Sequence, residues 1–123
     1  MALAPRPDGW VKYTHHRRAT IADWDSGKTL ESTKLGDAQY NPHIYNTDDA
    51  IRELELHCIM EGTVIRETAN KRTAFLKLDV VVGACSGHET SYEFAECTSG
   101  LYHGRPMCEE KLRKLGARIG AKS

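Results

Sequence analysis

Carboxylates on three successive predicted elements are the side chains of this sequence best suited to hold a metal ion. Glu55 falls in a predicted helix, Asp79 in a predicted strand and Glu96 in the strand that follows. Divalent cations such as Mg²⁺ prefer oxygen ligands, and carboxylates on adjacent strands can hold one ion against a phosphate. Lys77, on the same predicted face as Asp79, can position water and stabilise developing charge. We therefore expect catalytic roles for these four residues, with Mg²⁺ bound by Asp79 and Glu96.

A second set of side chains has the chemistry of a zinc site. Cys85 and His88 flank a turn at Gly87, while His103 and Cys108 approach or open the last predicted helix. Zinc binds four cysteine or histidine ligands tetrahedrally, and a knuckle, a hairpin and a ligand at a helix start outline a treble-clef finger. This pattern predicts Zn²⁺ as the alternative cofactor, in a nucleic-acid-binding or protein-binding module without catalysis.

A third interpretation needs no metal. His103 is followed by Arg105 in a predicted connecting loop over 101–107. A histidine that transfers protons beside an arginine that holds phosphate suits RNA cleavage. Small ribonuclease toxins also place a helix before an antiparallel sheet, which is a likeness of fold and not of motif. His103 is thus a further catalytic candidate, and Arg105 joins Arg17 and Arg18 as a candidate phosphate contact.

A helix must present Glu55 to the rest of the domain. Thr47 is suited to cap it, acidic residues fill its first turn, and Gly62 offers a left-handed stop, so the sequence predicts a helix over about 48–61. Its apolar arc contains Ile51, Leu54, Cys58 and Ile59, and Glu55 falls inside that arc. This carboxylate either reaches water or a basic partner at the margin, or faces a polar site on the sheet.

A sheet must present the remaining candidates. The pattern predicts strands over 63–67, 74–84 and 90–98, and a last helix over 107–115. Alternation places Lys77 and Asp79 on one face of the second strand, and Glu96 with Phe94 on one face of the third. Residues 1–9 read as an irregular arm, 10–24 as a strand or hairpin edge, and 25–45 as a long loop that has room for one short strand. The expected fold is α+β, a three-stranded antiparallel meander packed with helices.

The helix, meander and helix over 47–115 resemble the core of the PD-(D/E)XK nuclease superfamily. That resemblance implies an acid on the helix, an Asp on the second strand and a Glu-X-Lys on the third, at Glu55, Asp79 and the string 94–98. The sequence departs from the motif because Thr98 stands where the lysine belongs and no proline precedes Asp79. Lys77 would then replace the missing lysine. The resemblance implies Mg²⁺-dependent cleavage of phosphodiester bonds in nucleic acid.

Size and charge limit the remaining choices. A chain of 123 residues supports one domain, and 17 basic against 17 acidic side chains leave any polyanion to a local patch. No signal peptide or membrane span is expected, so we expect a cytoplasmic protein or an effector domain cut from a longer secreted one. A toxin of this kind would have an inhibitory or immunity protein as a partner. The four cysteines favour thiols or metal ligands, with two disulfides left open.

Overall fold

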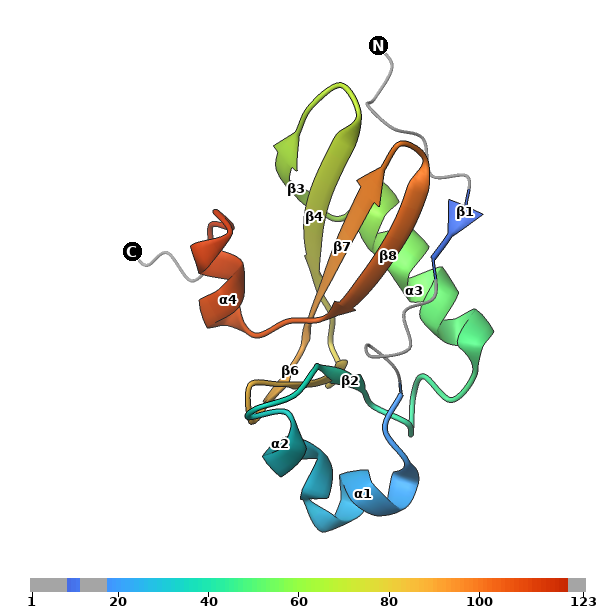
Figure 1. Cartoon of the computed structure of the whole chain (residues 1–123), viewed down its shortest axis with the longest axis vertical. Coiled ribbons are helices and arrows are strands. Elements are labelled where there is room, and N and C mark those ends of the chain that lie inside the picture. Colours follow the sequence, from blue (N-terminus) through green and yellow to red (C-terminus); the bar gives the residue numbers. More distant parts are fainter. Residues whose placement is uncertain (1–8, 12–17, 120–123) are drawn as a thin grey trace.

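The fold is organised around a central sheet. The computed structural model describes residues 9–11 and 18–119, so Arg17 lies outside the described residues. In sheet A the strands lie in the order β1 (Gly9–Trp10), β8 (Leu101–Pro106), β7 (Tyr92–Thr98), β4 (Lys71–Lys77) and β3 (Thr63–Glu67) (Figure 1). β1 runs parallel to β8 and all other neighbours are antiparallel. The predicted α+β fold of a small single domain is confirmed.

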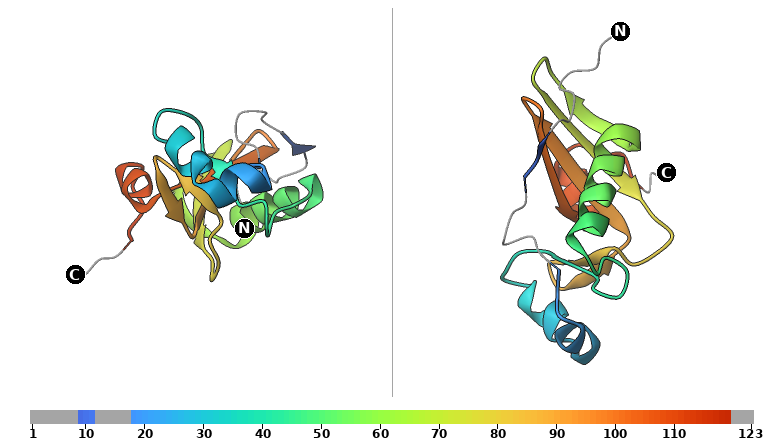
Figure 2. Two further views of the ribbon diagram at one scale, coloured as in Figure 1. Left: turned by 90° about the horizontal axis from the view of Figure 1, so that it is seen from below. Right: turned by 90° about the vertical axis from the view of Figure 1, so that its right-hand side faces the viewer.

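The long helix α3 (Asp48–Glu61) covers one face of sheet A (Figure 2). It begins as predicted, because the Thr47 hydroxyl accepts a hydrogen bond of 3.1 Å from the Ala50 N–H. Its end differs from the prediction, since Gly62 is extended, with φ −72° and ψ 175°. Glycine is required there by space: an added Cβ would lie 2.4 Å from the Cys58 carbonyl oxygen and 2.6 Å from that of Phe75.

The prediction of one strand over 74–84 is wrong, because this stretch contributes to two strands that belong to different sheets. β4 ends at Lys77, and β5 (Gly83–Cys85) joins sheet B between β2 (Gln39–Tyr40) and β6 (His88–Thr90). Across the interval the backbone N–H of Leu78 bonds to Ser91 and that of Val82 to Thr90, each at 2.8 Å. The alternation of apolar residues continues through 78–82 and therefore does not mark the change of sheet.

Two short helices lie beside sheet B, at the end of the molecule away from β3 (Figure 1). The strand predicted over 10–24 is wrong at its end, where α1 (Ile21–Ser26) begins after Thr20, whose hydroxyl accepts from the Asp23 N–H. Gly27, with φ 86°, separates it from α2 (Lys28–Ser32). The predicted long loop over 25–45 thus holds a helix and the short strand β2.

The loop predicted over 101–107 is also wrong, since residues 101–106 form β8. Glycine at 104 and proline at 106 resemble loop residues in a sequence. In the structure Pro106 is the last residue of the strand, a position where a missing N–H is tolerated. β8 pairs with β7 through Glu96↔His103 and Phe94↔Arg105, so it places these side chains in a regular sheet.

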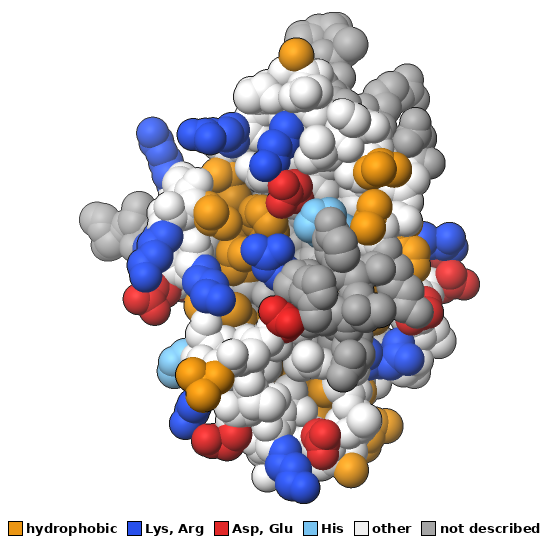
Figure 3. All heavy atoms as spheres, in the orientation of Figure 1, with side chains coloured by type: hydrophobic (Ala, Val, Ile, Leu, Met, Phe, Trp, Pro, Cys, Tyr) orange, Lys and Arg blue, Asp and Glu red, His pale blue; other side chains and the backbone are white. Residues whose placement is uncertain are grey.

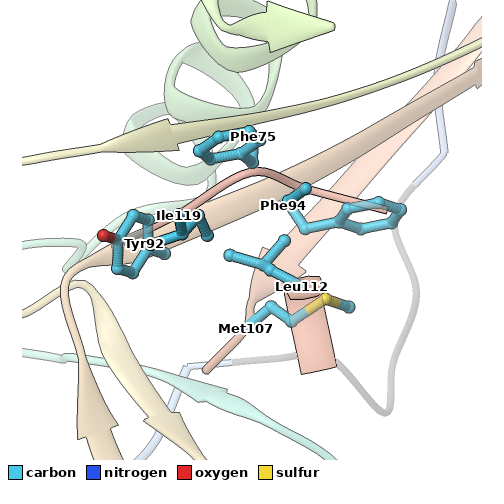
Figure 4. Packing of buried hydrophobic residues seen from close by; sticks show 7 residues of the cluster. Phe75, Tyr92, Phe94, Met107, Leu112 and Ile119 are labelled. Atoms are coloured by element: carbon cyan, nitrogen blue, oxygen red, sulfur yellow. The ribbon is translucent and has the colours of Figure 1, made fainter. Parts of the chain in front are cut away.

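The helix α4 (Glu109–Lys114) packs on the face of sheet A opposite α3, within the predicted range 107–115. Leu112 of α4 lies against Phe94 and Met107, with the rings of Phe75 and Tyr92 beside them (Figure 4). A second group of buried residues lies between α3 and sheet A and consists of Cys58, Ile59, Ala74, Ala95, Cys97 and Tyr102. Sheet A is therefore packed on both faces, but α4 is short and covers only one end of its face.

Leu112→Ala should detach α4 from the sheet. The Leu112 side chain is fully buried at 0% exposure, and we expect its truncation to lower the free energy of unfolding by roughly 2–5 kcal/mol. The matched control is Leu115→Ala at the end of the same helix, where the leucine is 49% exposed. Urea unfolding followed by circular dichroism measures both variants, and equal losses of stability would contradict this packing.

Candidate functional site

The face of sheet A opposite α3, called here the open face, carries a group of polar side chains. The registers place Glu96 of β7 between Thr73 of β4 and His103 of β8, and Phe94 between Phe75 and Arg105 in the next row. Lys71 of β4 reaches the same place from one row further along. We call Lys71, Glu96, His103 and Arg105 the open-face cluster.

Glu96 is the centre of this cluster. One of its carboxylate oxygens lies 2.9 Å from Lys71 Nζ, and the other lies 4.0 Å from His103 Nε2. Arg105 places its guanidinium carbon 5.1 Å from the centroid of the Phe94 ring, a cation–π contact at the border of the apolar core. The side chains of Glu96 and His103 remain 24% and 15% exposed, so the cluster is both held in place and open to solvent.

His103 is suited to accept a proton at neutral pH. Burial lowers the pKa of its imidazole, the Glu96 carboxylate opposes this, and the nearby Arg105 and Lys71 charges lower the pKa further. The net shift is downward, so the neutral form predominates near pH 7. The cluster thus combines a proton acceptor, a carboxylate and two cations on one face.

A second polar group lies directly behind this cluster, on the face that α3 covers. The Tyr40 hydroxyl lies 2.7 Å from Glu55 Oε2 and 2.5 Å from Glu93 Oε2, and Trp10 Nε1 donates to Glu55 Oε1 at 2.7 Å. Glu55 is 3% exposed and Glu93 is 0% exposed. We call Tyr40, Glu55 and Glu93 the buried carboxyl cluster.

The buried carboxyl cluster must hold an extra proton. A phenol has one proton to donate, so one of the two carboxyls that contact Tyr40 must itself be the donor. Burial raises the pKa of Glu55 to about 7, although hydrogen bonds from Trp10, Tyr40 and the Gly104 backbone oppose the shift. Burial and the neighbouring Glu55 charge raise the pKa of Glu93 well above its ordinary value. Because both carboxyls are buried, we interpret this group as a support and not as a site for substrate.

Gly104 connects the two groups. It lies in β8 between His103 and Arg105, and its backbone hydrogen-bonds to Glu55. An added Cβ at Gly104 would lie 2.6 Å from Glu93 Oε2 and 2.5 Å from the Phe94 carbonyl oxygen. The strand therefore rests directly on the buried carboxyls, which fixes the height of the His103 and Arg105 side chains above the sheet.

The carboxylates predicted to bind Mg²⁺ are not brought together. Glu55 lies on the side of α3 that faces sheet A, whereas Glu96 lies on the open face, so sheet A separates them. Asp79 is exposed in the segment between β4 and β5, and Lys77 is exposed at the end of β4. Within residues 9–11 and 18–119, no group of three or more acidic, histidine or cysteine side chains is arranged to hold a metal ion.

The predicted zinc ligands are only half assembled. Of the four, Cys85 and Cys108 are close together, with their Sγ atoms 3.8 Å apart. His88 is exposed on β6, and His103 belongs to the open face of sheet A. The four residues do not converge because His103 lies in a strand and not in a loop next to the last helix.

Of the predicted phosphate contacts, Arg105 belongs to the open-face cluster. Arg18 instead points to the start of α3, where its Nη1 lies 3.7 Å from Asp48 Oδ1. Sequence reasoning missed Lys71, Tyr40 and Glu93. The signal for Glu93 was present, because it alternates with Ala95 and Cys97 on the face of β7 that packs against α3. A carboxyl buried at that position needs a hydrogen-bonding partner, and the same holds for Glu55.

No protein-family model, curated protein or solved structure matches this chain. The resemblance to the PD-(D/E)XK superfamily therefore stays a prediction. Among the helices of the described residues, none has the length and apolar character needed to cross a membrane. The chemistry of the chain is accordingly inferred from the two polar groups on either side of sheet A.

The buried carboxyl cluster makes stability depend on pH. The pKa of Glu55 is raised in the folded state, so its contribution is complete below the unfolded value of 4.5 and is lost as pH rises through about 7. We expect Glu55 by itself to lower the free energy of unfolding by up to about 3 kcal/mol from about pH 5 to about pH 8, with Glu93 acting in the same direction. Urea unfolding at a series of pH values measures this loss.

Glu55→Gln should reduce this pH dependence, because glutamine keeps a neutral side chain of the same shape, and should leave the part that comes from Glu93, whose pKa burial also raises. Glu53→Gln is the matched control, since Glu53 is exposed on the same helix. A pH dependence in Glu55→Gln equal to that of the unmodified protein would contradict the role of the buried carboxyls.

Proposed function

We propose that this protein cleaves RNA without a metal ion, through the open-face cluster. The observation that carries the proposal is the cross-strand pair of Glu96 and His103, flanked by Lys71 and Arg105 on an accessible sheet face. Proton transfer and phosphate binding are the two functions that phosphodiester cleavage requires in the absence of a metal. Both types of group are present within one patch.

His103 is the general base of the proposed reaction. Its neutral imidazole accepts the proton of a ribose 2′-hydroxyl, and the resulting oxygen attacks the adjacent phosphorus. The P–O5′ bond breaks, which leaves a 2′,3′-cyclic phosphate, and the departing 5′-oxygen takes a proton from water. The imidazolium that forms is balanced by the Glu96 carboxylate, whose oxygen lies 4.0 Å from Nε2. Arg105 holds the phosphate, because a planar guanidinium can bind two of its oxygens as their charge increases. Lys71 adds a second cation on the other side of Glu96.

The proposal specifies RNA because its nucleophile belongs to the substrate. An internal 2′-hydroxyl needs a base but no activated water, so a metal that lowers the pKa of water is not required. DNA lacks this hydroxyl. The total charge of the chain is zero, but Lys and Arg side chains gather around an apolar patch on the side of the molecule that carries the open face (Figure 3). This local concentration supports binding of a polyanion.

His103→Ala should abolish RNA cleavage measured in EDTA. We expect the rate to fall by roughly 10²–10⁴-fold, the usual contribution of a general base. Arg105→Ala should also slow the reaction, because it removes a phosphate contact.

The matched control is His57→Ala, because His57 is exposed on α3 and α3 covers the opposite face of the sheet. Full activity of His103→Ala in EDTA would overturn the proposal. Cleavage that needs Mg²⁺ and requires Asp79 would restore the carboxylate mechanism.

The pH profile tests the role of His103 independently. Since the pKa of His103 is lowered, the cleavage rate should rise with pH and reach half of its maximum below 6.5, the ordinary value for histidine. The Glu96 carboxylate raises this pKa, so Glu96→Gln should move the rise to still lower pH. Initial rates on a fluorescent RNA oligonucleotide measure both profiles. A profile for Glu96→Gln that is unchanged, or displaced to higher pH, would contradict the effect of the Glu96 charge on His103.

A further inference from the structure

Two cysteines of separate elements lie side by side at the junction of sheet B and α4. Cys85 is the last residue of β5, and Cys108 is the N-cap of α4. Their sulfur atoms are 3.8 Å apart, and both are free thiols. The Cys108 backbone also hydrogen-bonds to the Cys85 sulfur, which keeps the two residues close together.

The two thiols differ in their access to solvent. Cys85 is 3% exposed, whereas Cys108 is half-buried and lines an open cleft of ≈ 480 Å³. Other residues lining this cleft include Lys77, His88, Tyr92, Glu109 and Arg113. It therefore offers both positive and negative groups next to one thiol. A small zwitterionic peptide, which carries carboxylates and an ammonium group, matches that mixture of charges.

We propose that Cys85 and Cys108 form a reversible disulfide. The oxidant is a low-molecular-weight peptide disulfide that enters this cleft. In the first step the Cys108 thiolate attacks one sulfur of the small disulfide, which breaks its S–S bond and releases one thiolate. In the second step the Cys85 thiolate attacks Cys108 Sγ and releases the other. Two protein thiols are oxidised and one small disulfide is reduced to two thiols.

The order of these steps follows from the structure. Only Cys108 meets the cleft, and burial raises the pKa of the Cys85 thiol, so Cys85 is the resolving cysteine. The sulfur atoms must approach from 3.8 Å to ~2.05 Å, a movement within reach of side-chain rotation. The remaining cysteines, Cys58 and Cys97, are both 0% exposed between α3 and sheet A, where no small disulfide reaches them.

The test exposes the folded protein to excess oxidised glutathione and maps its cysteines by mass spectrometry. Trypsin alone leaves Cys85, Cys97 and Cys108 on one peptide, because Arg105 is followed by proline. A glutamate-specific protease, which cuts after Glu89 and Glu96, and chymotrypsin, which cuts after Tyr102, are therefore added so that each cysteine lies on its own peptide. We expect a Cys85–Cys108 cross-link, with Cys58 and Cys97 reduced, and a higher thermal midpoint that returns to its original value with dithiothreitol.

Two variants distinguish the roles of the thiols. Cys85→Ser should accumulate a mixed disulfide with glutathione at Cys108, because the resolving thiol is absent. Cys108→Ser should gain no adduct at Cys85 over the same time. The proposal is overturned if Cys85 and Cys108 stay reduced in the folded unmodified protein, if the cross-link joins other cysteines, or if Cys85 in Cys108→Ser reacts as fast as Cys108 in Cys85→Ser.

Discussion

The hydrogen bonds that Tyr40 shares with Glu55 and Glu93 are the interaction on which the rest of the structure depends. They join sheet B through Tyr40, the long helix through Glu55 and the centre of sheet A through Glu93. Trp10 adds the edge strand β1 to the same group. Two buried carboxyls would repel each other and lose their hydration, so these elements associate only if a proton is shared among them. The fold thus requires a particular protonation state as well as apolar packing.

This buried cluster also determines the geometry of the open face. Alternation in β8 places Gly104 against the carboxyls and its neighbours His103 and Arg105 on the other side. Strand β7 does the same with Glu93 behind and Glu96 in front. A side chain in a strand is positioned as firmly as the backbone that carries it. The rigid contact behind the sheet is therefore what keeps the partly exposed Glu96 and His103 within ion-pair distance.

Local signals in the sequence predicted the parts of the fold that depend on local interactions. The helix α3 was predicted from its cap and its acidic first turn, and the faces of β7 were predicted from simple alternation. β8 was missed because its glycine and proline are required by long-range contacts and not by a turn. The same limit applies to the site: Glu96, His103 and Arg105 were identified individually, but their convergence depends on the register between β7 and β8. Lys71 was missed for the same reason.

The outer strand β3 has a consequence for how the molecule behaves beside copies of itself. Its pairing with β4 shifts register between Val64 and Arg66, and most of its side chains are exposed. An irregular edge with charged side chains is a poor template for another strand, even though Val64 is 46% exposed. The irregularity leaves the pairing with β4 intact. It also means that another molecule does not meet a straight row of N–H and C=O groups with which to pair. Protection against aggregation is thus built into the outer strand itself.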